Sequence, residues 1–573
     1  MGANIAIPER KNLDTIPKLV KHWSVSLPDQ ELFVFYNGDR RESYTCRQVF
    51  QLAGKFSSRL RHQYGFKKGD IIANTLPNSP ERVFTDLGII LAGCVTLNAA
   101  TMFADGSDFL TSANNSGLLA AIVCPEGNGP AWRILKNYIR GDATSSTAVF
   151  ACDKAPLMET AILVSRQPTG SRGHFLHELQ DSTEPIFVEQ GVQPDDILIV
   201  LTTSGSTGYC KLVAKTHRDL IDQWLDACNY VTEHSRQQWT TNVIYNDRLI
   251  GWLGGFPFGT YINADTRVLL DVFDTQGLKV GADLWKIICA EKVDYAIILP
   301  LDLDYLMNHT SFAVAADYKM KMICCGGQPI RKDQFLSYYA VAREVSVVYA
   351  TTEAGLLSYD ILQVSGISSI VAENKVKDYF CGQVAPGVEV RIVDADNKEC
   401  QTGQVGTIHV KGRAVFRGYV NRVENPDPKT LLAFTKDGWL NTDDSGYFDE
   451  ARNLYVLGRL KDVITFGAAF VYPGWLEPKI TQHPAISEAC IVPVSDPVLY
   501  HNICAIVKPV DGSDLSLQEL ETICRDIFLT DKDMEGTPVP KFYLILQDFP
   551  QTATGKVDRK ILQKMAEEKF GVH

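Results

Sequence analysis

The sequence lacks an apolar run long enough for a membrane-spanning helix, so we expect no integral membrane segment. A membrane-spanning helix needs about 20 mostly apolar residues. The most apolar stretch, residues 87–100, is shorter and contains Gly88, Gly93 and Asn98, so we expect a packed helix followed by a strand. The amino terminus also lacks the apolar core of a signal peptide, and the chain does not end in the peroxisomal Ser-Lys-Leu signal. We expect a cytoplasmic protein.

The sequence also lacks a high density of cysteines and an excess of positive charge. The 14 cysteines are spread over 573 residues, unlike the cysteine framework of a small secreted domain, so we expect reduced and mostly buried thiols. Lys and Arg number 56 against 68 Asp and Glu, a net charge of -12. This charge gives no long-range attraction for nucleic acid or an anionic membrane. Phosphate binding must therefore come from local donors, and we expect a small-molecule partner.

The composition, with 45% apolar and 22% charged residues, is that of a globular protein, and 573 residues are too many for one core. Short runs rich in Val and Ile alternate with helix-like stretches, which predicts an α/β fold with layers of helices on mostly parallel sheets. We expect a large body of this kind and a smaller partner domain. The apolar runs are residues 71–75, 120–124, 197–201, 296–299, 322–325 and 345–349.

The pattern changes after about residue 384. Close-set strands with Gly and Asn turns at 388–394, 406–411 and 453–457 predict a small antiparallel, β-barrel-like section. The segment after Lys461 has its own alternation of strands and helices and the size of an independent domain. We therefore expect an N-terminal domain over residues 1–460 and a smaller α+β C-terminal domain over 461–573.

The sharpest local signal is a loop rich in hydroxyl groups, directly after the apolar run 197–201. Backbone N–H groups of such a loop at a strand end can surround phosphate oxygens, and a lysine supplies positive charge. It is not a Walker loop, because no Ser or Thr follows the lysine. Alone, the pattern is also typical of a flexible surface loop. The candidate phosphate-binding residues are Thr203, Ser204, Gly205, Ser206, Thr207, Gly208 and Lys211.

Two further strand ends carry candidate residues. Glycines after the run 322–325 would let a ligand approach the backbone, although two glycines are also an ordinary turn. The run 345–349 is followed by hydroxyls and Glu353 at the edge where an open α/β sheet places its ligand. Alone, Glu353 is equally typical of a helix amino terminus. The candidates are Gly327, Gln328 and Pro329 after the first strand, and Tyr349, Ala350, Thr351, Thr352 and Glu353 after the second.

The last two segments lie nearer the carboxyl end. In the first, Asp444 can accept from ribose hydroxyls and Arg459 can hold the sugar or phosphate edge, although an exposed acidic turn has the same pattern. The second, residues 550–559, places Lys556 next to a glycine. A lysine on such a loop can reach across a domain interface and neutralise developing charge, whereas most lone lysines are solvated surface charges.

Taken in order, the five segments resemble the adenylate-forming superfamily of acyl-CoA synthetases, aryl-CoA ligases, peptide-synthetase adenylation domains and firefly luciferases. The resemblance runs from about residue 44 to 559. The family's phosphate loop reads Thr-Ser-Gly-Thr-Thr-Gly-x-Pro-Lys-Gly, and here Cys210 and Leu212 replace its Pro and last Gly. The resemblance implies a carboxylic acid attacking ATP to give an acyl adenylate and pyrophosphate. It further implies transfer to a thiol, commonly of coenzyme A, after the smaller, mobile domain rotates.

The resemblance also implies roles for the candidate residues. Thr203 to Gly208 and Lys211 would hold the ATP phosphates, and Gly327, Gln328 and Pro329 would contribute to the adenine pocket. Tyr349 would stack on adenine, Thr352 would touch the α-phosphate, and Glu353 would bind Mg²⁺, which suits a lone glutamate beside substrate phosphates. Asp444 and Arg459 would bind the ribose, with Lys461 at the hinge. Lys556, with Lys211, Thr352 and Glu353, would be catalytic.

Several positions depart from the family pattern. Asp443 replaces a usual glycine, and Asp tolerates a positive φ better than most residues if one is needed there. Thr465, Ala468 and Trp475 replace a usual lysine, glycine and glutamate near the path of the thiol. Other acceptors therefore stay open: a carrier-protein thiol, an amine, or O₂ as in luciferases. A nucleotide-binding homologue that has lost turnover is the alternative from another class.

The acid cannot be named from the sequence. Members of the family often have a histidine in the stretch equivalent to residues 245–247, and none occurs there. The aromatic side chains of Trp252, Phe256 and Phe258 could line an apolar slot for the acid, although core packing is the commoner fate of such residues.

Overall fold

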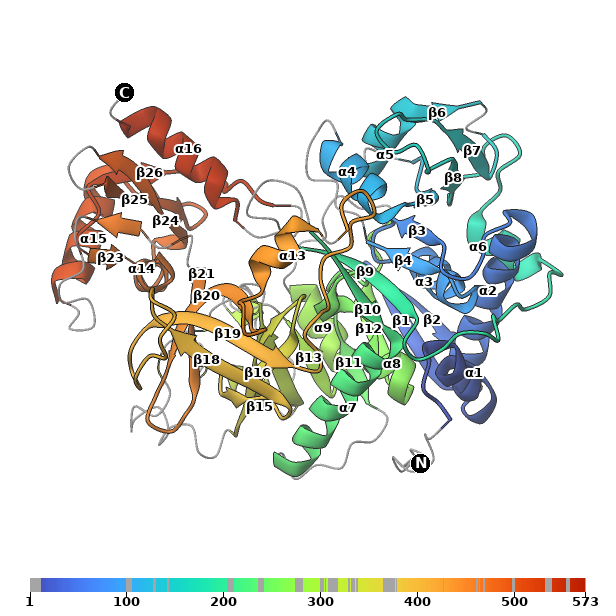
Figure 1. The fold of residues 1–573 in the computed structure, drawn as a ribbon, viewed down its shortest axis with the longest axis horizontal. Helices are drawn as coiled ribbons and strands as arrows, with labels where there is room; N and C mark the ends of the chain where they lie inside the picture. Colours follow the sequence, from blue (N-terminus) through green and yellow to red (C-terminus); the bar gives the residue numbers. More distant parts are fainter. Residues whose placement is uncertain are drawn as a thin grey trace. The chain divides into compact units, whose positions relative to one another are not determined.

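The computed structural model forms two compact units (Figure 1). The first comprises residues 1–376, 384–389 and 411–440, and the second residues 377–383, 390–410 and 441–573. The structure describes residues 12–98, 106–126, 130–141, 144–203, 211–234, 242–273, 282–298, 303, 306–307, 318–327, 330, 335, 338–363, 377, 379–425, 427–459, 462, 464–466, 469–471, 473–496, 500–530, 538–552 and 557–571.

The first unit contains a nine-stranded sheet with a parallel centre. The neighbours from β1 to β15 through β12, β11, β13 and β14 are parallel, whereas β2 at one edge and β16 near the other pair antiparallel. The strands, in spatial order, are β17 (Gln383–Val384), β16 (Gly355–Gln363), β15 (Ala342–Thr351), β14 (Met320–Gly326), β13 (Tyr295–Ile297), β11 (Val243–Tyr245), β12 (Thr266–Leu270), β1 (Glu31–Asn37) and β2 (Arg40–Thr45).

The second sheet of this unit has eight strands and the same plan. Its centre from β9 to β8 through β4, β3 and β5 is parallel, and β10, β7 and β6 pair antiparallel at the edges. The strands, in spatial order, are β10 (Lys211–Thr216), β9 (Ile197–Thr203), β4 (Val95–Leu97), β3 (Ile71–Asn74), β5 (Ala120–Val123), β8 (Thr160–Leu163), β7 (Thr147–Phe150) and β6 (Ile139–Arg140).

Helices pack on these sheets, and local sequence explains where they begin. Thr45 and Gln48 form a capping box at the start of α2, and Ser79 caps α3 ahead of a proline at its first position. The helices are α1 (Ile16–Ser26), α2 (Cys46–Ser58), α3 (Pro80–Leu91), α4 (Ser107–Ser116), α5 (Pro130–Leu135), α6 (Phe175–Asp181), α7 (His217–His234), α8 (Phe258–Asn263), α9 (Ala282–Ala290) and α13 (Pro428–Ala433). Helix α3 is buried along its whole length, as expected for an element packed inside a layered fold.

The second unit begins with a four-stranded sheet of β18 (Val388–Val393), β19 (Gly406–Gly412), β20 (Leu440–Phe448) and β21 (Leu454–Arg459). A five-stranded sheet follows, built from β22 (Ile464–Phe466), β23 (Ala469–Val471), β24 (Ile486–Asp496), β25 (Tyr500–Pro509) and β26 (Phe542–Ile545). Alternate residues of β25 enter two cores: Ile503 and Val507 pack with residues of α14 (Pro473–Ile480) and α15 (Leu517–Thr530), and Cys504 and Ile506 with residues of α16 (Arg559–Phe570).

The expected α/β fold with a smaller α+β domain is confirmed. Five of the six apolar runs coincide with β3, β5, β9, β14 and β15, and the run 296–299 overlaps β13. The stretch from residue 87 is the helix followed by a strand that we expected, α3 and β4. The division at residues 460 and 461 stays a prediction. Cysteines in the described part of the chain are free thiols, and burial raises the pKa of Cys46 to about 12.

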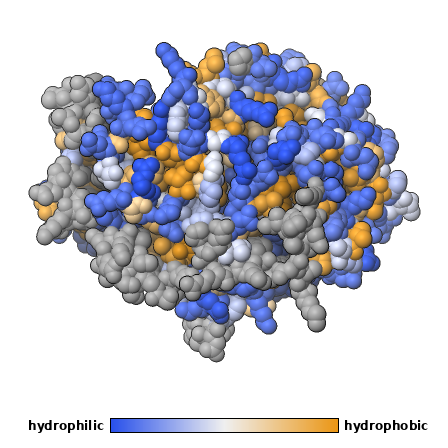
Figure 2. Space-filling view, turned by 60° about the horizontal axis from the view of Figure 1, so that its bottom comes forward, coloured by the Kyte–Doolittle hydropathy of each residue, from blue (hydrophilic) through white to orange (hydrophobic). Residues whose placement is uncertain are grey.

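No helix among the described residues combines the length and the apolar character needed to cross a membrane. On the face drawn in Figure 2, hydrophobic residues occur in small groups between hydrophilic ones. Scattered apolar surface of this kind is usual for folded proteins.

Candidate active site

The hydroxyl-rich segment joins two antiparallel strands of the eight-stranded sheet. Thr203 ends β9 and pairs with Lys211, the first residue of β10. Thr203 and Lys211, the described residues on either side of the segment, therefore lie side by side. Of the candidate residues in this segment, Ser204, Gly205, Ser206, Thr207 and Gly208 lie outside the described residues.

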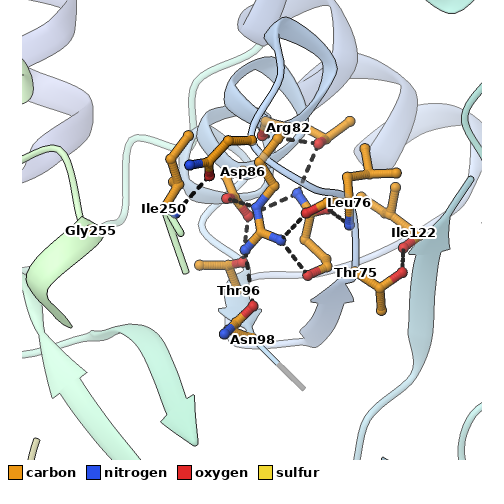
Figure 3. A network of polar contacts seen from close by, with 12 residues as sticks. Thr75, Leu76, Arg82, Asp86, Thr96, Asn98, Ile122, Ile250 and Gly255 are labelled. Atoms are coloured by element: carbon orange, nitrogen blue, oxygen red, sulfur yellow. Dashed lines mark hydrogen bonds and ion pairs between the residues drawn. The ribbon is translucent and has the colours of Figure 1, made fainter. Parts of the chain in front are cut away.

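A buried arginine network braces the strand that leads into this segment (Figure 3). Arg82, 1% exposed, donates from Nε to Asp86 Oδ2 at 2.6 Å and from Nη1 to the Leu76 carbonyl at 2.7 Å. Its Nη2 reaches Asn98 Oδ1 at 3.3 Å. The Asn98 carbonyl accepts from Thr202 Oγ1 at 3.0 Å. A buried charge with hydrogen-bond partners at each nitrogen is held rigidly. The network therefore fixes the end of β9 just before the phosphate-binding candidates.

The predicted adenine-side residues lie at neighbouring strand ends. Gly326 on β14 pairs with Val348 on β15, and a Cβ on Gly326 would lie 2.6 Å from the Val348 carbonyl oxygen, so only glycine fits. Gly327 has a φ of 74°, which glycine adopts without strain. Gly327 and Tyr349 therefore lie at the same edge of the nine-stranded sheet, and Tyr349 is 9% exposed. Gln328 and Pro329 lie outside the described residues.

Glu353 lies in the turn between β15 and β16. Ala350 and Thr351 end β15, and Thr351 pairs with Gly355, which leaves Thr352, Glu353 and Ala354 as a three-residue turn. Thr351 Oγ1 accepts from the Ala354 N–H at 3.0 Å, and Gly355 has the positive φ of 72° that such hairpins require. The alternative of a helix amino terminus at Glu353 is wrong, because the element that follows is a strand.

Tyr419 links Lys211 to Glu353, and no sequence pattern predicted this role for Tyr419. Lys211 Nζ donates to Tyr419 Oη at 3.2 Å, and Tyr419 Oη donates to Glu353 Oε1 at 2.9 Å. The ammonium also lies 4.8 Å from the centre of the tyrosine ring, within the range of a cation–π interaction. The structure therefore brings together a cation from the phosphate-binding candidates and the carboxylate predicted to bind metal.

A second lysine of β10 holds the main chain of Glu353. Lys215 is 2% exposed, and its Nζ donates to the carbonyls of Glu353 at 3.3 Å and Ala414 at 3.1 Å. The Phe416 N–H donates to the same Glu353 carbonyl at 2.8 Å. Burial lowers the pKa of Lys215 to about 8, and Asp219 and Glu353 act in the opposite direction. Because side chains alternate along a strand, Lys211 and Lys215 share one face of β10. Lys215 contacts the Glu353 carbonyl directly, whereas Lys211 is linked to the Glu353 carboxylate through Tyr419.

The predicted ribose residues also lie together, within the second unit. Asp444 on β20 pairs across the sheet with Arg459 on β21, and Arg459 Nε lies 3.0 Å from Asp444 Oδ1. Asp444 is 6% exposed. Asp443 has a φ of 59°, so the position that is usually glycine does take the left-handed conformation that Asp tolerates.

The structure describes the stem of the last motif but not its tip. Gln551 and Val557 form an antiparallel bridge, and Asp558 caps α16 by accepting from the N–H groups of Lys560 and Ile561. Arg559, at the start of that helix, forms an ion pair with Glu477 and donates to the Ile491 carbonyl at 3.1 Å. These contacts fix the base of the loop within the second unit. The predicted residues Lys461, Ala468 and Lys556 lie outside the described residues.

Two of the aromatic residues considered for the acid pocket, Phe256 and Phe258, contribute to the hydrophobic core. Phe256 is 4% exposed and belongs to the main hydrophobic core of the first unit. Phe258 stacks on Trp224 with ring centres 5.8 Å apart. Core packing therefore describes Phe256 better than a pocket lining does.

Comparison with known sequences gives two family matches. The profile described as AMP-binding enzyme matches residues 20–420, and that described as AMP-binding enzyme C-terminal domain matches residues 476–556. The chain is similar to a mitochondrial medium-chain acyl-CoA ligase of Danio rerio, 24% identical over 95% of this chain and 87% of the relative. It is also similar to 4-coumarate–CoA ligase-like 3 of Arabidopsis thaliana, 24% identical over 99% of this chain and 95% of the relative.

Solved structures share the fold at low identity. The o-succinylbenzoate CoA synthetase of Bacillus subtilis in complex with its acyl-adenylate intermediate is 20% identical, covers 95% of this chain and 97% of its own, and has a TM-score of 0.73. The amide bond synthetase of Marinactinospora thermotolerans, also 20% identical, covers 96% and 99% with a TM-score of 0.70. The family profile matches residues 20–420, which is more than half of this chain. The chain therefore belongs to the AMP-binding enzyme family.

Proposed function

We propose that this enzyme activates a carboxylic acid with ATP and transfers the acyl group to coenzyme A. In the first step a carboxylate oxygen forms a bond to the α-phosphorus, and the bond from that phosphorus to the pyrophosphate oxygen breaks. In the second step the thiol sulfur attacks the acyl carbon, the bond to the AMP oxygen breaks, and the thiol proton is lost to solvent. The products are a thioester, AMP and pyrophosphate.

The observation that carries the proposal is the Lys211, Tyr419 and Glu353 arrangement. A cation at the start of β10 and a carboxylate in the β15–β16 turn lie on either side of one hydroxyl. Phosphoryl transfer depends mainly on such positioned charges. Glu353 fits Mg²⁺, since this ion prefers one or two carboxylates together with substrate phosphates, and when bound it supplies charge neutralisation on those phosphates.

The remaining residues take the roles expected from the sequence. Thr203 to Gly208 and Lys211 would surround the phosphates, and Thr352 would donate to the α-phosphate. Gly327, Gln328, Pro329 and Tyr349, with Ala350 and Thr351, would hold adenine. Asp444 and Arg459 would hold the ribose, and Lys556 would neutralise charge as the carboxylate attacks phosphorus. The likeness to relatives named as acyl-CoA and 4-coumarate–CoA ligases supports a fatty or aryl acid.

Product analysis tests the proposal. The protein is mixed with ATP, Mg²⁺, coenzyme A and a panel of fatty and aryl acids, and acyl-CoA, AMP, amide and emitted light are measured. Acyl-CoA formed in equal amount with AMP is the expected result. AMP with an amide, with an acylated carrier protein, or with light would assign another acceptor. Absence of AMP with every acid would indicate a homologue without turnover.

A further inference from the structure

We propose that Tyr419 is a positioning residue of the magnesium-nucleotide site. Its hydroxyl holds the Lys211 ammonium and the Glu353 carboxylate apart, so that both charges stay available to the phosphates of ATP and to the metal. This inference rests on the proposed function, because that function assigns Lys211 to phosphate and Glu353 to Mg²⁺.

The geometry of the bridge carries the inference. Lys211 and Glu353 each hydrogen-bond the Tyr419 hydroxyl, at 3.2 and 2.9 Å, and in the described part of the chain they make no direct ion pair with each other. Opposite charges attract more strongly as they approach. Without the hydroxyl between them, the two groups would close into a pair that nucleotide and metal must first break. The hydroxyl therefore acts as a spacer.

The tyrosine is itself held firmly, as a spacer must be. Tyr419 is 8% exposed, and its ring packs edge-on against Phe416 with centres 4.7 Å apart. The backbone N–H of Tyr419 donates to Thr430 Oγ1 at 2.8 Å, and Tyr419 forms an antiparallel β-bridge with Val213 on β10. Main-chain pairing thus sets where the ring lies along β10, two residues from Lys211. A group fixed in this way costs no reorganisation when ligand binds.

The main chain of Glu353 is also held in place. Its carbonyl accepts from Lys215 Nζ and from the Phe416 N–H, so the turn cannot carry the carboxylate away from Tyr419 without breaking both bonds. A carboxylate has about four lone-pair positions, and the bond from Tyr419 uses one of them. Acceptor capacity therefore remains for Mg²⁺ while the carboxylate stays in place.

Nucleotide binding by Tyr419→Phe tests the inference, because this change removes one oxygen and keeps the ring. Isothermal calorimetry with MgATP and with AMP requires no knowledge of the acid. We expect MgATP to bind about tenfold more weakly, the size typical of a lost hydrogen bond to a charged group. AMP should bind within about twofold of wild type, since it lacks the outer phosphates and their metal.

Tyr36→Phe is the matched control. Tyr36 also donates to a glutamate, Glu291, which in turn pairs with Arg41 at 2.7 Å, but it lies on β1 near the far edge of the nine-stranded sheet. This variant should bind both nucleotides like wild type. Tyr419→Met is the second variant, because it fills buried space without a hydroxyl and should show the same selective loss.

Each outcome is decisive. Equal weakening of MgATP and AMP, or unchanged MgATP binding, overturns the inference. So does loss of the native near-ultraviolet circular dichroism in both Tyr419 variants, because the hydroxyl would then be structural. Failure of the wild-type protein to bind MgATP would instead defeat the proposed function. Wild-type binding together with an unaffected Tyr419→Phe variant defeats this inference alone.

Discussion

His217 is predicted to make the stability of the first unit depend on pH. It begins α7, is 3% exposed, and its Nδ1 accepts from the Ile16 N–H at 3.2 Å. Burial lowers the pKa of His217 from 6.5 to about 4, although Asp196 and Asp14 act in the opposite direction and Lys68 acts with burial. The folded state therefore prefers the neutral imidazole, whose Nδ1 is the acceptor that holds the start of α1.

The sign and size follow from the two pKa values. The folded pKa lies below the unfolded one, so the contribution is fully present above pH 6.5 and is lost as the pH falls toward 4. At about 1.36 kcal/mol for each pH unit, the whole loss is about 3 kcal/mol. About 2 kcal/mol of it should be gone by pH 5.

Urea unfolding of wild type and His217→Gln at pH 7.5 and pH 5 measures this loss. Glutamine keeps an acceptor but does not titrate, so the difference in free energy of unfolding between the two proteins should shrink by about 2 kcal/mol at the lower pH. His62→Gln, at an exposed histidine, is the matched control for the substitution itself. A His217→Gln difference that is the same at both pH values within about 0.5 kcal/mol would refute the reasoning.

Substitutions at three further residues test the account. Lys556→Ala should abolish adenylate formation but leave the use of a presynthesised adenylate largely intact, and rapid-quench assays of the two half-reactions would contradict this if both fell equally. Asp444→Asn should raise the KM for ATP about tenfold by weakening the ribose contact, which a steady-state ATP titration measures and an unchanged KM would disprove. Asp443→Val should lower the free energy of unfolding by about 1–2 kcal/mol, since a β-branched residue is strained at a φ of 59°, whereas Asp443→Gly should not; thermal melts compare them, and equal melting temperatures would count against the strain.

Many strands of the first unit could be predicted because they coincide with apolar runs in the sequence. β3, β5, β9, β14 and β15 each pair with at least one parallel neighbour, and largely buried strands of this kind read as mostly apolar runs rather than as an alternating pattern. Candidate residues placed at the ends of β9, β14 and β15 therefore fell at the edges of sheets. The resemblance then supplied roles that no local pattern contains.

Tyr419 and Lys215 could not be predicted in the same way. Tyr419 is 66 residues from Glu353 and 208 from Lys211, and nothing in its local sequence marks a hydroxyl that contacts both. Lys215 interrupts a strand as a charged residue, which normally predicts an exposed position. It is buried because two main-chain carbonyls, of Glu353 and Ala414, accept from its ammonium. Such contacts depend on tertiary structure alone.

Acid-dependent exchange of pyrophosphate into ATP tests the central claim most directly. The measurement follows labelled pyrophosphate in the presence of Mg²⁺ and one acid at a time, without coenzyme A, so that only adenylate formation and its reversal are observed. We expect labelled ATP with at least one acid and none without acid. No exchange with any acid, together with no binding of MgATP by the wild-type protein, would contradict the account.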